Sequence, residues 1–539
     1  MDAYSSFNTR VTPQSEPIPL SGQVENNAGG FVYKISDWDV MLRFLILGSE
    51  GGTFYVNERK LTRENAINVI NCINVDGERA VRMIVEVSES GRAPKNDPAI
   101  FALALAASAI SADTRKVALA ALPKVCRIPT HLFHFLTYVE GLRGWGRGLK
   151  RAVGEWYNSQ PVDRLAYQVV KYQSRDGWSN ADALRLSHPK TTEKARNLLY
   201  KWIVDGEYGD EIPQIVYAFQ SAKTAPPEDL YWHIKNYNLS REMLPTEALT
   251  RPEVWEALLE KMPPEAMIRN LGNMSKVGLL APLSNASKHV VSVLHDVVKL
   301  KKARIHPIQV LVAGRTYGAG RGVKGKGEWT PVPAVVDALD DAFYLCFNNI
   351  EPTGKNLLFG VDVSGSMSSS CGGLPISCAE GAAAMALACA KTETNYYVMG
   401  FTAGPNSGRY FRQHDQDDAL MRFVDLGITP KMRLNDALTK TRNMNFGSTD
   451  CALPMLWALK NKVKVDAFVV ITDSETWAGS IHPSQALKQY RQAMGVNAKE
   501  VVIGMTATEF SIADPSDPLT LDVVGFDTAV PGLIQEFIR

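Results

Sequence analysis

The spacing of apolar residues divides the chain into two regions. In the first region, segments of 10–13 residues carry apolar side chains every three or four positions and are separated by Gly, Pro, Asp or Ser. This period is typical of amphipathic helices, which we expect at residues 64–75, 78–87, 98–110, 113–122, 130–142 and 251–261. Short helices that cannot bury their apolar faces alone commonly stack into a helical-repeat solenoid. Because the sequence has no clean repeat period, an irregular all-helical domain is the alternative.

From residue 356 onward the apolar segments become shorter and almost uniformly apolar. Residues 356–363, 396–401, 467–472 and 500–505 are rich in β-branched and aromatic residues, as parallel strands buried on both faces should be. Helical stretches are expected between them at 376–392, 431–441, 450–461 and 483–494. Alternating strands and helices predict a doubly wound α/β sheet, which binds ligands beyond the carboxyl ends of its strands.

These patterns predict three parts of the chain. Residues 1–30 are polar and contain several prolines, which predicts a mobile or surface-draped N-terminal arm. Residues 31–355 form the helical domain and residues 356–539 the α/β domain. The segment 312–333 is dense in Gly and basic residues and is expected to be a loop. Its stretch 320–326 resembles a phosphate-binding loop, but Gly327 stands where Ser or Thr should follow Lys326, so nucleotide binding is not expected there.

Composition fits a folded protein that is neither fibrous nor membrane-spanning. Apolar residues make up 45% of the 539 residues and charged residues 21%. The longest apolar run, residues 99–110, is too short to cross a bilayer, and we expect no secretory signal at the N-terminus. The seven cysteines are scattered without a Cys-x-x-Cys pair. This pattern predicts reduced thiols in a cytoplasmic protein and no zinc ribbon.

The clearest chemical motif follows the first predicted strand. Asp362, Ser364 and Ser366 alternate along the chain there, and Thr449 and Asp473 follow at the ends of two other segments. Carboxylate and hydroxyl oxygens are the ligands that Mg²⁺ or Mn²⁺ prefers. The five residues match the Asp-x-Ser-x-Ser…Thr…Asp pattern of the metal-ion-dependent adhesion site of von Willebrand factor A domains. This resemblance implies a divalent cation, most readily Mg²⁺, with an open position for a carboxylate of an acidic protein ligand.

Basic residues are concentrated in one part of the helical region. Residues 115–201 contain 16 Lys and Arg against 6 Asp and Glu, although the whole chain has a net charge of only +1. A second stretch, residues 299–326, contains eight basic residues and no acidic one. Within residues 143–190 these cations alternate with Trp and Tyr, a pattern that favours single-stranded nucleic acid. Each single aromatic ring is nevertheless more readily explained as part of the core, and the cations as a solvated face.

The run from residue 141 to 190, followed by a domain with the motif DVSGSM, resembles the TROVE and von Willebrand A modules of the 60-kDa Ro autoantigen family. The resemblance implies HEAT-like helical repeats that form a monomeric ring, and an α/β von Willebrand A domain. It also implies Y RNA and the single-stranded 3′ ends of misfolded small RNAs, such as defective 5S rRNA precursors, as partners. RNA-contacting positions carried over from this resemblance, and their basic neighbours, are Arg143, Arg147, Lys150, Arg151, Lys171, Arg175, His188 and Lys190.

Helical spacing adds a geometric expectation for two of these residues. Lys171 and Arg175 are four positions apart, so on a helix their side chains would project from one face. His188, which precedes Pro189, is expected to cap a helix or lie in a loop.

The basic region and the resemblance together favour an RNA-binding protein without catalytic activity, and the resemblance implies a role in RNA quality control, which we expect in the cytoplasm with a nuclear pool. Two alternatives remain open. One is an interaction scaffold whose metal site binds an acidic partner. The other is a metal-dependent phosphohydrolase, which receives less support because the second Asp of a phosphoaspartate-type motif is replaced by Ser364.

Overall fold

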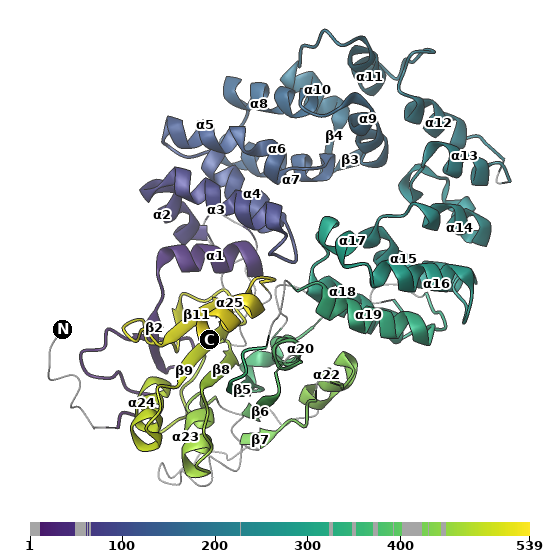
Figure 1. Cartoon of the computed structure of the whole chain (residues 1–539). Coiled ribbons are helices and arrows are strands. Elements are labelled where there is room, and N and C mark those ends of the chain that lie inside the picture. Colours follow the sequence, from purple (N-terminus) through teal and green to yellow (C-terminus); the bar gives the residue numbers. More distant parts are fainter. Residues whose placement is uncertain are drawn as a thin grey trace. The chain divides into compact units, whose positions relative to one another are not determined.

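The computed structural model describes residues 11–48, 61, 63, 66–226, 228–322, 327–347, 352–369, 376–391, 393–401, 423–429, 431–442, 449–525 and 527–539. The chain forms two compact units. The sheet unit comprises Met1–Asn68, Arg92–Pro94 and Phe347–Arg539, and the helical unit comprises Val69–Gly91 and Lys95–Cys346 (Figure 1). The N-terminal 68 residues thus group with the C-terminal part of the chain, so the sheet unit includes residues on both sides of the division expected at residue 30.

A six-stranded sheet forms the centre of the sheet unit. Its strand order is β11–β9–β8–β5–β6–β7, and every pair is parallel except β6 with β7. The strands are β5 (Asn356–Asp362), β6 (Asn395–Phe401), β7 (Phe423–Asp425), β8 (Ala467–Thr472), β9 (Lys499–Gly504) and β11 (Thr520–Val524). The chain moves from β5 to β6 on one side and later to β8 on the other. The carboxyl ends of β5 and β8 therefore mark the switch point at which such sheets bind ligands.

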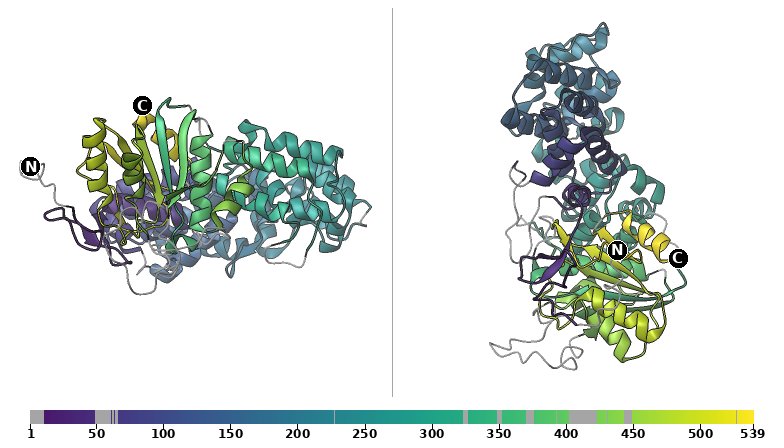
Figure 2. Two further views of the ribbon diagram at one scale, coloured as in Figure 1. Left: turned by 90° about the horizontal axis from the view of Figure 1, so that it is seen from below. Right: turned by 90° about the vertical axis from the view of Figure 1, so that its left-hand side faces the viewer.

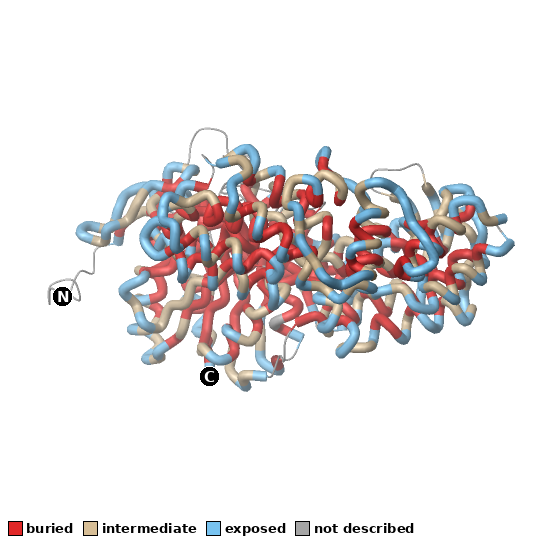
Figure 3. Tube along the Cα trace, turned by 90° about the horizontal axis from the view of Figure 1, so that it is seen from above, coloured by how far each residue is buried: buried red, intermediate tan, exposed pale blue. Residues whose placement is uncertain are grey.

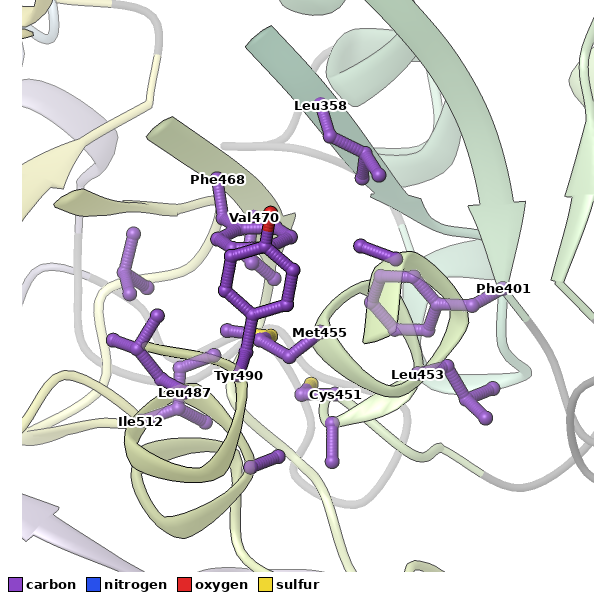
Figure 4. Close-up of a cluster of buried hydrophobic side chains, with 14 of the residues drawn as sticks. Leu358, Phe401, Cys451, Leu453, Met455, Phe468, Val470, Leu487, Tyr490 and Ile512 are labelled. Atoms are coloured by element: carbon purple, nitrogen blue, oxygen red, sulfur yellow. The ribbon is translucent and has the colours of Figure 1, made fainter. Parts of the chain in front are cut away.

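Helices cover both faces of this sheet (Figure 2). They are α20 (Cys378–Ala390), α22 (Leu434–Arg442), α23 (Leu453–Lys460), α24 (Pro483–Met494) and α25 (Val530–Ile538), and the short 3₁₀ helix η5 spans Ser366–Ser368. One core lies between the sheet and α23 and α24, where Phe468 and Tyr490 meet edge to face at 5.0 Å (Figure 4). Strands β5, β8 and β9 are buried along almost their whole length, and Figure 3 shows how buried and exposed residues are distributed along the chain trace. The four predicted strands and four predicted helices of this region are confirmed, with ends that differ by a few residues.

The N-terminal segment belongs to the sheet unit. Strands β1 (Val24–Glu25) and β2 (Phe31–Lys34) form an antiparallel sheet with β10 (Phe510–Ser511), and helix α1 (Asp37–Leu47) follows. Arg43 of α1 is fully buried and donates to the Asp522 carboxylate at 2.7 Å. Residues 11–30 of the predicted arm are attached to the sheet unit by main-chain hydrogen bonds such as that from the Gln14 N–H to the Gly479 carbonyl, and residues 1–10 lie outside the described residues. Strands of two to four residues give little local signal, and β10, the second partner of β2, lies more than 470 positions further along the chain.

The helical unit is a succession of short helices. They are α2 (Ile67–Val75), which begins in the sheet unit, α3 (Gly77–Ser90), α4 (Asp97–Ala107), α5 (Ala112–Ala120), α6 (Leu122–Val125), α7 (Pro129–Leu142), α8 (Arg147–Asn158), α9 (Val162–Lys171), α10 (Asn180–Ser187), α11 (Lys194–Asp205), α12 (Gln214–Ala222), α13 (Leu230–Tyr237), α14 (Pro252–Glu260), α15 (Pro264–Lys276), α16 (Asn285–Leu294), α17 (Val297–Lys302), α18 (Pro307–Gly318) and α19 (Pro333–Leu345). The 3₁₀ helices η3 (Arg241–Met243) and η4 (Thr246–Thr250) lie between α13 and α14. The six predicted helices of this region are confirmed as α2, α3, α4, α5, α7 and α14.

Neighbouring helices of this unit pack in pairs, which buries the apolar stripe of each. Helix α3 illustrates the local signals: Asp76 caps its N-terminus by accepting from the Arg79 N–H at 2.9 Å, and Gly91 ends it with a left-handed φ of 69°. Near that end, the Arg304 guanidinium donates to the Glu89 carbonyl at 2.6 Å. This bond joins the beginning of the helical unit to the turn between α17 and α18.

Two local expectations are wrong. The segment 312–333 is not a loop throughout, because α18 continues to Gly318 and only then does the chain leave the helix. Residues 323–326 of the loop resembling a phosphate-binding loop lie outside the described residues. Lys171 and Arg175 do not share a helix, since α9 ends at Lys171. Across the described part of the chain, each helix is too short or too polar to cross a lipid bilayer.

Candidate functional site

The carboxyl end of β5 carries three of the five predicted metal-binding residues. Asp362 is the last residue of β5 and is fully buried. Its Oδ1 accepts from the Ser364 N–H at 2.9 Å, which turns the chain sharply after the strand. The hydroxyl oxygens of Ser364 and Ser366 lie 3.0 Å apart and are also buried. The structure therefore brings one carboxylate and two hydroxyls into one small region.

Asp473 follows β8, the neighbouring strand. The Thr472 hydroxyl donates to Asp362 Oδ2 at 2.6 Å and so fixes the end of β8 against the end of β5. Asp473 is buried, and its Oδ1 accepts from the Glu475 N–H at 3.1 Å. Its Oδ2 is buried without a hydrogen-bond partner among the described residues. A buried carboxylate oxygen without a donor is costly, and a bound cation would remove that cost.

Thr449 lies in a loop that contacts the loop after β8. Residues 443–448, which precede it, lie outside the described residues. Thr449 itself is buried, and its carbonyl accepts from the N–H groups of Trp477 at 3.2 Å and Ala478 at 3.0 Å. The Thr449 main chain is therefore attached to the segment that also carries Asp473.

The surroundings of Asp362 and Asp473 disfavour the ionised form of both carboxyl groups. Burial raises the pKa of Asp362 to about 6, although the Ser364 and Thr472 hydroxyls partly counter the shift. Burial, Asp362 and Glu475 together raise the pKa of Asp473 well above its usual value. A divalent cation would offset the repulsion between these carboxylates. The five predicted residues would offer a cation two carboxylates and three hydroxyls. This set fits a hard cation such as Mg²⁺.

The predicted nucleic-acid residues occupy a different part of the fold, within the helical unit. Arg175 lies on strand β3 (Ser174–Arg175), which pairs with β4 (Trp178–Ser179) in a two-residue hairpin. Asp176 and Gly177 form the turn with φ values of 53° and 81°. An Asp-Gly pair is a strong signal for this type of turn, and the helical interpretation overlooked it. Arg175 is exposed at the tip of the hairpin.

Lys171 is partly covered. Its ammonium lies 4.0 Å from the Glu242 carboxylate, 5.3 Å from the Tyr172 ring centre and 6.0 Å from that of Tyr167. Only 12% of its side chain is exposed. Lys171 lines a small pocket that also contains Arg241, Lys261 and Asn270. Sequence reasoning missed these partners because they lie at least 70 positions further along the chain.

Helices α8 and α10 pack against each other (Figure 1), and further predicted basic residues lie on α8 and after the end of α10. Arg147, Lys150 and Arg151 occupy the first turns of α8. A Cβ placed on Gly154 of α8 would lie 3.5 Å from Pro189. Asn158 of the same helix donates to the Lys190 carbonyl at 3.1 Å. The segment from His188 to Lys190 therefore crosses the second half of α8. His188 ends α10 with a φ of 49°, which confirms its expected capping role.

Arg143 lies beside the hairpin. It ends α7, two residues before Trp145, whose ring centre is 5.7 Å from that of Trp178 on β4. Two other aromatic residues of the segment, Trp156 and Tyr157, are fully buried, as expected for core rings. Arg143, Arg147, Arg151, Arg175, His188 and Lys190 are exposed, and Lys150 is partly exposed.

Comparisons with known proteins identify both parts of the chain. Residues 24–218 and 236–316 match the family model of the TROVE domain, and residues 356–538 match that of the Ro60 vWA domain. A protein of Deinococcus radiodurans named RNA-binding protein RO60 is 43% identical over 544 residues, covering 99% of this chain and 98% of that protein. A Caenorhabditis elegans protein of the same name is 34% identical over 611 residues, covering 98% of this chain and 92% of its own length.

A solved structure has the same fold. The crystal structure of the Deinococcus radiodurans RO (RSR) protein matches with a TM-score of 0.69 and 42% sequence identity. The match covers 94% of this chain and 99% of that chain. The likeness therefore extends over both units.

Proposed function

Because the chain belongs to the Ro60 family, in which a TROVE domain is joined to a von Willebrand A domain, we propose that it is the RNA-binding protein of a small ribonucleoprotein particle. Its RNAs are Y RNAs and the single-stranded 3′ ends of misfolded small RNAs, and its role is RNA quality control. The compartment we propose is the cytoplasm, with a nuclear pool. Buried free thiols at Cys72, Cys126, Cys346, Cys378 and Cys451 suit a reducing compartment.

The observation that carries this proposal is the group of exposed cations on α8, the β3–β4 hairpin and the end of α10. Phosphate contacts supply most of the affinity of such proteins for RNA, and they do not depend on sequence. An unpaired strand offers these cations its phosphates and leaves its bases free to stack on partly exposed rings such as Trp145. A correctly folded RNA whose 3′ end is paired offers no such strand, so recognition selects by shape.

Salt dependence tests the RNA proposal. Arg151 is exposed and lies 3.9 Å from Glu155, one turn further along α8. Arg151→Ala should weaken binding of a hairpin RNA with a single-stranded 3′ tail and reduce the slope of log K against log salt concentration by about one. Arg82 is a matched control, since it is also an exposed arginine paired within its helix, to Glu78 at 2.9 Å. Equal slopes for Arg151→Ala and Arg82→Ala would contradict the placement of RNA on α8.

We propose further that Asp362, Ser364, Ser366, Thr449 and Asp473 hold Mg²⁺ or Mn²⁺. When bound, the cation would present an open coordination position to a carboxylate of an acidic protein partner. The residues of this chain fix the donor oxygens: Thr472 holds the Asp362 carboxylate, and the Glu475 N–H holds that of Asp473. The buried Asp473 Oδ2 supports this proposal.

The protein is proposed to bind RNA without cleaving it. The five metal-binding residues include no nucleophile activated by a histidine or lysine, and their donor set suits recognition of a ligand oxygen. Incubation of the purified chain with Mg²⁺ and end-labelled RNA tests this directly. Sustained turnover that disappears in Asp362→Ala would instead support a metal-dependent phosphohydrolase.

A further inference from the structure

Residues 11–34, here called the N-terminal segment, insert polar side chains between two loops. One loop contains Thr449 and Asp450, and the other, residues 473–482, follows β8 and contains Asp473. Gln14 is fully buried although it lies more than 430 positions from these loops. Its Nε2 donates to Asp450 Oδ1 at 2.8 Å and to the Ile481 carbonyl at 2.9 Å. Its Oε1 accepts from the Thr476 hydroxyl, and its N–H donates to the Gly479 carbonyl at 2.9 Å. One side chain thus bonds to the residue that follows Thr449 and to the loop that follows Asp473.

Two asparagines of the same segment bond to the residues next to Asp473. Asn26 Nδ2 donates to the carbonyls of Ser474 at 3.2 Å and Thr476 at 2.8 Å. Asn27 Nδ2 donates to Glu475 Oε1 at 2.7 Å. Every residue from 474 to 476 therefore accepts from, or donates to, the N-terminal segment. The Glu475 N–H in turn donates to Asp473 Oδ1. Glu475 is therefore the single residue that links the N-terminal segment to the Asp473 carboxylate through hydrogen bonds.

This loop needs external support because of its backbone conformation. Ser474 has a φ of 63°, in the left-handed region that residues other than glycine rarely adopt. Such a conformation is strained and persists only where the surroundings hold it in place. Asn26 supplies one such constraint through the Ser474 carbonyl.

Two glycines permit the close approach. A Cβ on Gly30 would lie 1.9 Å from the Thr476 carbonyl oxygen, and a Cβ on Gly479 would lie 2.2 Å from Gln14 Nε2. No larger residue fits at either position without moving main chain or the Gln14 side chain. A glycine in the N-terminal segment and another in the loop therefore allow the two to pack closely together.

We propose that Gln14, Asn26 and Asn27 are positioning residues for the cation site, so that cation affinity depends on the N-terminal segment. The proposal rests on the proposed function of Asp362, Ser364, Ser366, Thr449 and Asp473. Residues that orient metal ligands typically change metal affinity 10- to 100-fold when they are replaced. By reciprocity, cation binding must also stabilise the N-terminal segment on the loop.

Titration calorimetry of the full-length protein with Mn²⁺ tests this proposal. Gln14→Met keeps the length of the side chain but removes its hydrogen bonds, and we expect the Kd for Mn²⁺ to rise about tenfold. Gln23→Met is the matched control. Gln23 lies in the same segment, but it bonds to the Ile18 N–H, the Phe31 carbonyl and His482 at the α24 end of the loop, and not to Asp450 or to residues 474–476, so its Kd should stay at the wild-type value. An unchanged Kd in Gln14→Met overturns the proposal.

A general loss of folding is distinguished by two further measurements. The melting temperature in EDTA reports stability without the cation, and a raised Kd supports the proposal only if this temperature stays close to that of Gln23→Met. Asn27→Ala is a second variant, because Asn27 is exposed and its side chain donates to the Glu475 carboxylate. We expect a severalfold rise in its Kd. If both Gln14→Met and Asn27→Ala bind Mn²⁺ as the wild type does, the N-terminal segment has no positioning role.

Failure of the proposed cation site gives a different result. If the wild-type protein binds no Mn²⁺, or if Asp473→Ala binds as well as the wild type, the site itself is wrong and the positioning role falls with it. If Asp473→Ala abolishes binding while Gln14→Met does not alter it, only the positioning role is wrong. Hydrogen exchange adds a readout without substitution in the segment: saturating Mn²⁺ should slow exchange of the Gln14 and Phe31 amides in the wild type but not in Asp473→Ala.

Discussion

Glu500 shows how a single buried carboxyl group can make stability depend on pH. It lies near the start of β9 and is fully buried. Burial raises its pKa to about 8, because the nearby Arg491 guanidinium is already bound to Asp517 at 2.5 Å and compensates only in part. The folded protein therefore holds a proton on Glu500 at pH values where the unfolded chain has lost it.

The sign of the pH effect follows from this shift. Between about pH 4.5 and 8 the folded state binds the proton more tightly, so the stability that Glu500 contributes is present at low pH and is lost as the pH rises. Glu500→Gln should remove this dependence, and its melting temperature relative to wild type should increase from pH 6 to pH 8.5. The expected contribution is at most about 1.4 kcal/mol per pH unit. Glu536→Gln, which removes an exposed carboxyl group, is the control variant.

The residues of the cation site differ in how far the sequence could reveal them. Asp362, Ser364 and Ser366 form a local motif after an obvious strand, so their type and spacing suffice for a prediction. Gln14 carries no such signal, because its role depends on the folding of a segment onto loops more than 430 positions away. Long-range contacts of this kind are set by the tertiary fold and leave no pattern in nearby residues.

The β3–β4 hairpin is the element on which the placement of Arg175 depends. Gly177 has a φ of 81°, a conformation that only glycine adopts without strain. Gly177→Ala should cost about 1 kcal/mol and displace both Arg175 and Trp178, so the affinity for tailed RNA should fall severalfold. Gly209→Ala is the control, because Gly209 is exposed with free space around its Cα and no left-handed φ. Fluorescence anisotropy with labelled RNA measures both, and equal affinities would argue against a role for the hairpin.

Element prediction succeeded where apolar periodicity is strong and failed where a short turn competes with it. Strand β8 and helix α24 occur within the predicted bounds because their apolar patterns are unambiguous. The continuation of α9 beyond Lys171 was expected from the spacing to Arg175, but the Asp176-Gly177 turn ends the helical run and starts a hairpin. Strands β1 and β2 were missed because they are only two and four residues long, and because β2 is held by β10, more than 470 positions away.

At the scale of the whole molecule, the two proposed sites belong to two compact units, each with its own core. The cation ligands all lie in the sheet unit, and the exposed cations of α8 and the hairpin lie in the helical unit. Sites that share no residues or partners usually contribute independently to free energy. The architecture therefore predicts separate duties, in which the sheet unit binds the divalent cation and an acidic partner while the helical unit binds RNA.

This separation is testable with one variant in each unit. Asp362→Ala should abolish the rise in melting temperature that Mg²⁺ produces in the wild type, because it removes a carboxylate from the cation site. It should leave the Kd for tailed RNA unchanged, whereas Arg151→Ala should weaken RNA binding and keep the full response to Mg²⁺. The double variant should show the sum of the two effects in free energy to within about 0.5 kcal/mol. If Asp362→Ala weakens RNA binding, or if Mg²⁺ changes the RNA Kd of the wild type at constant ionic strength, the two units are coupled and the cation takes part in RNA recognition.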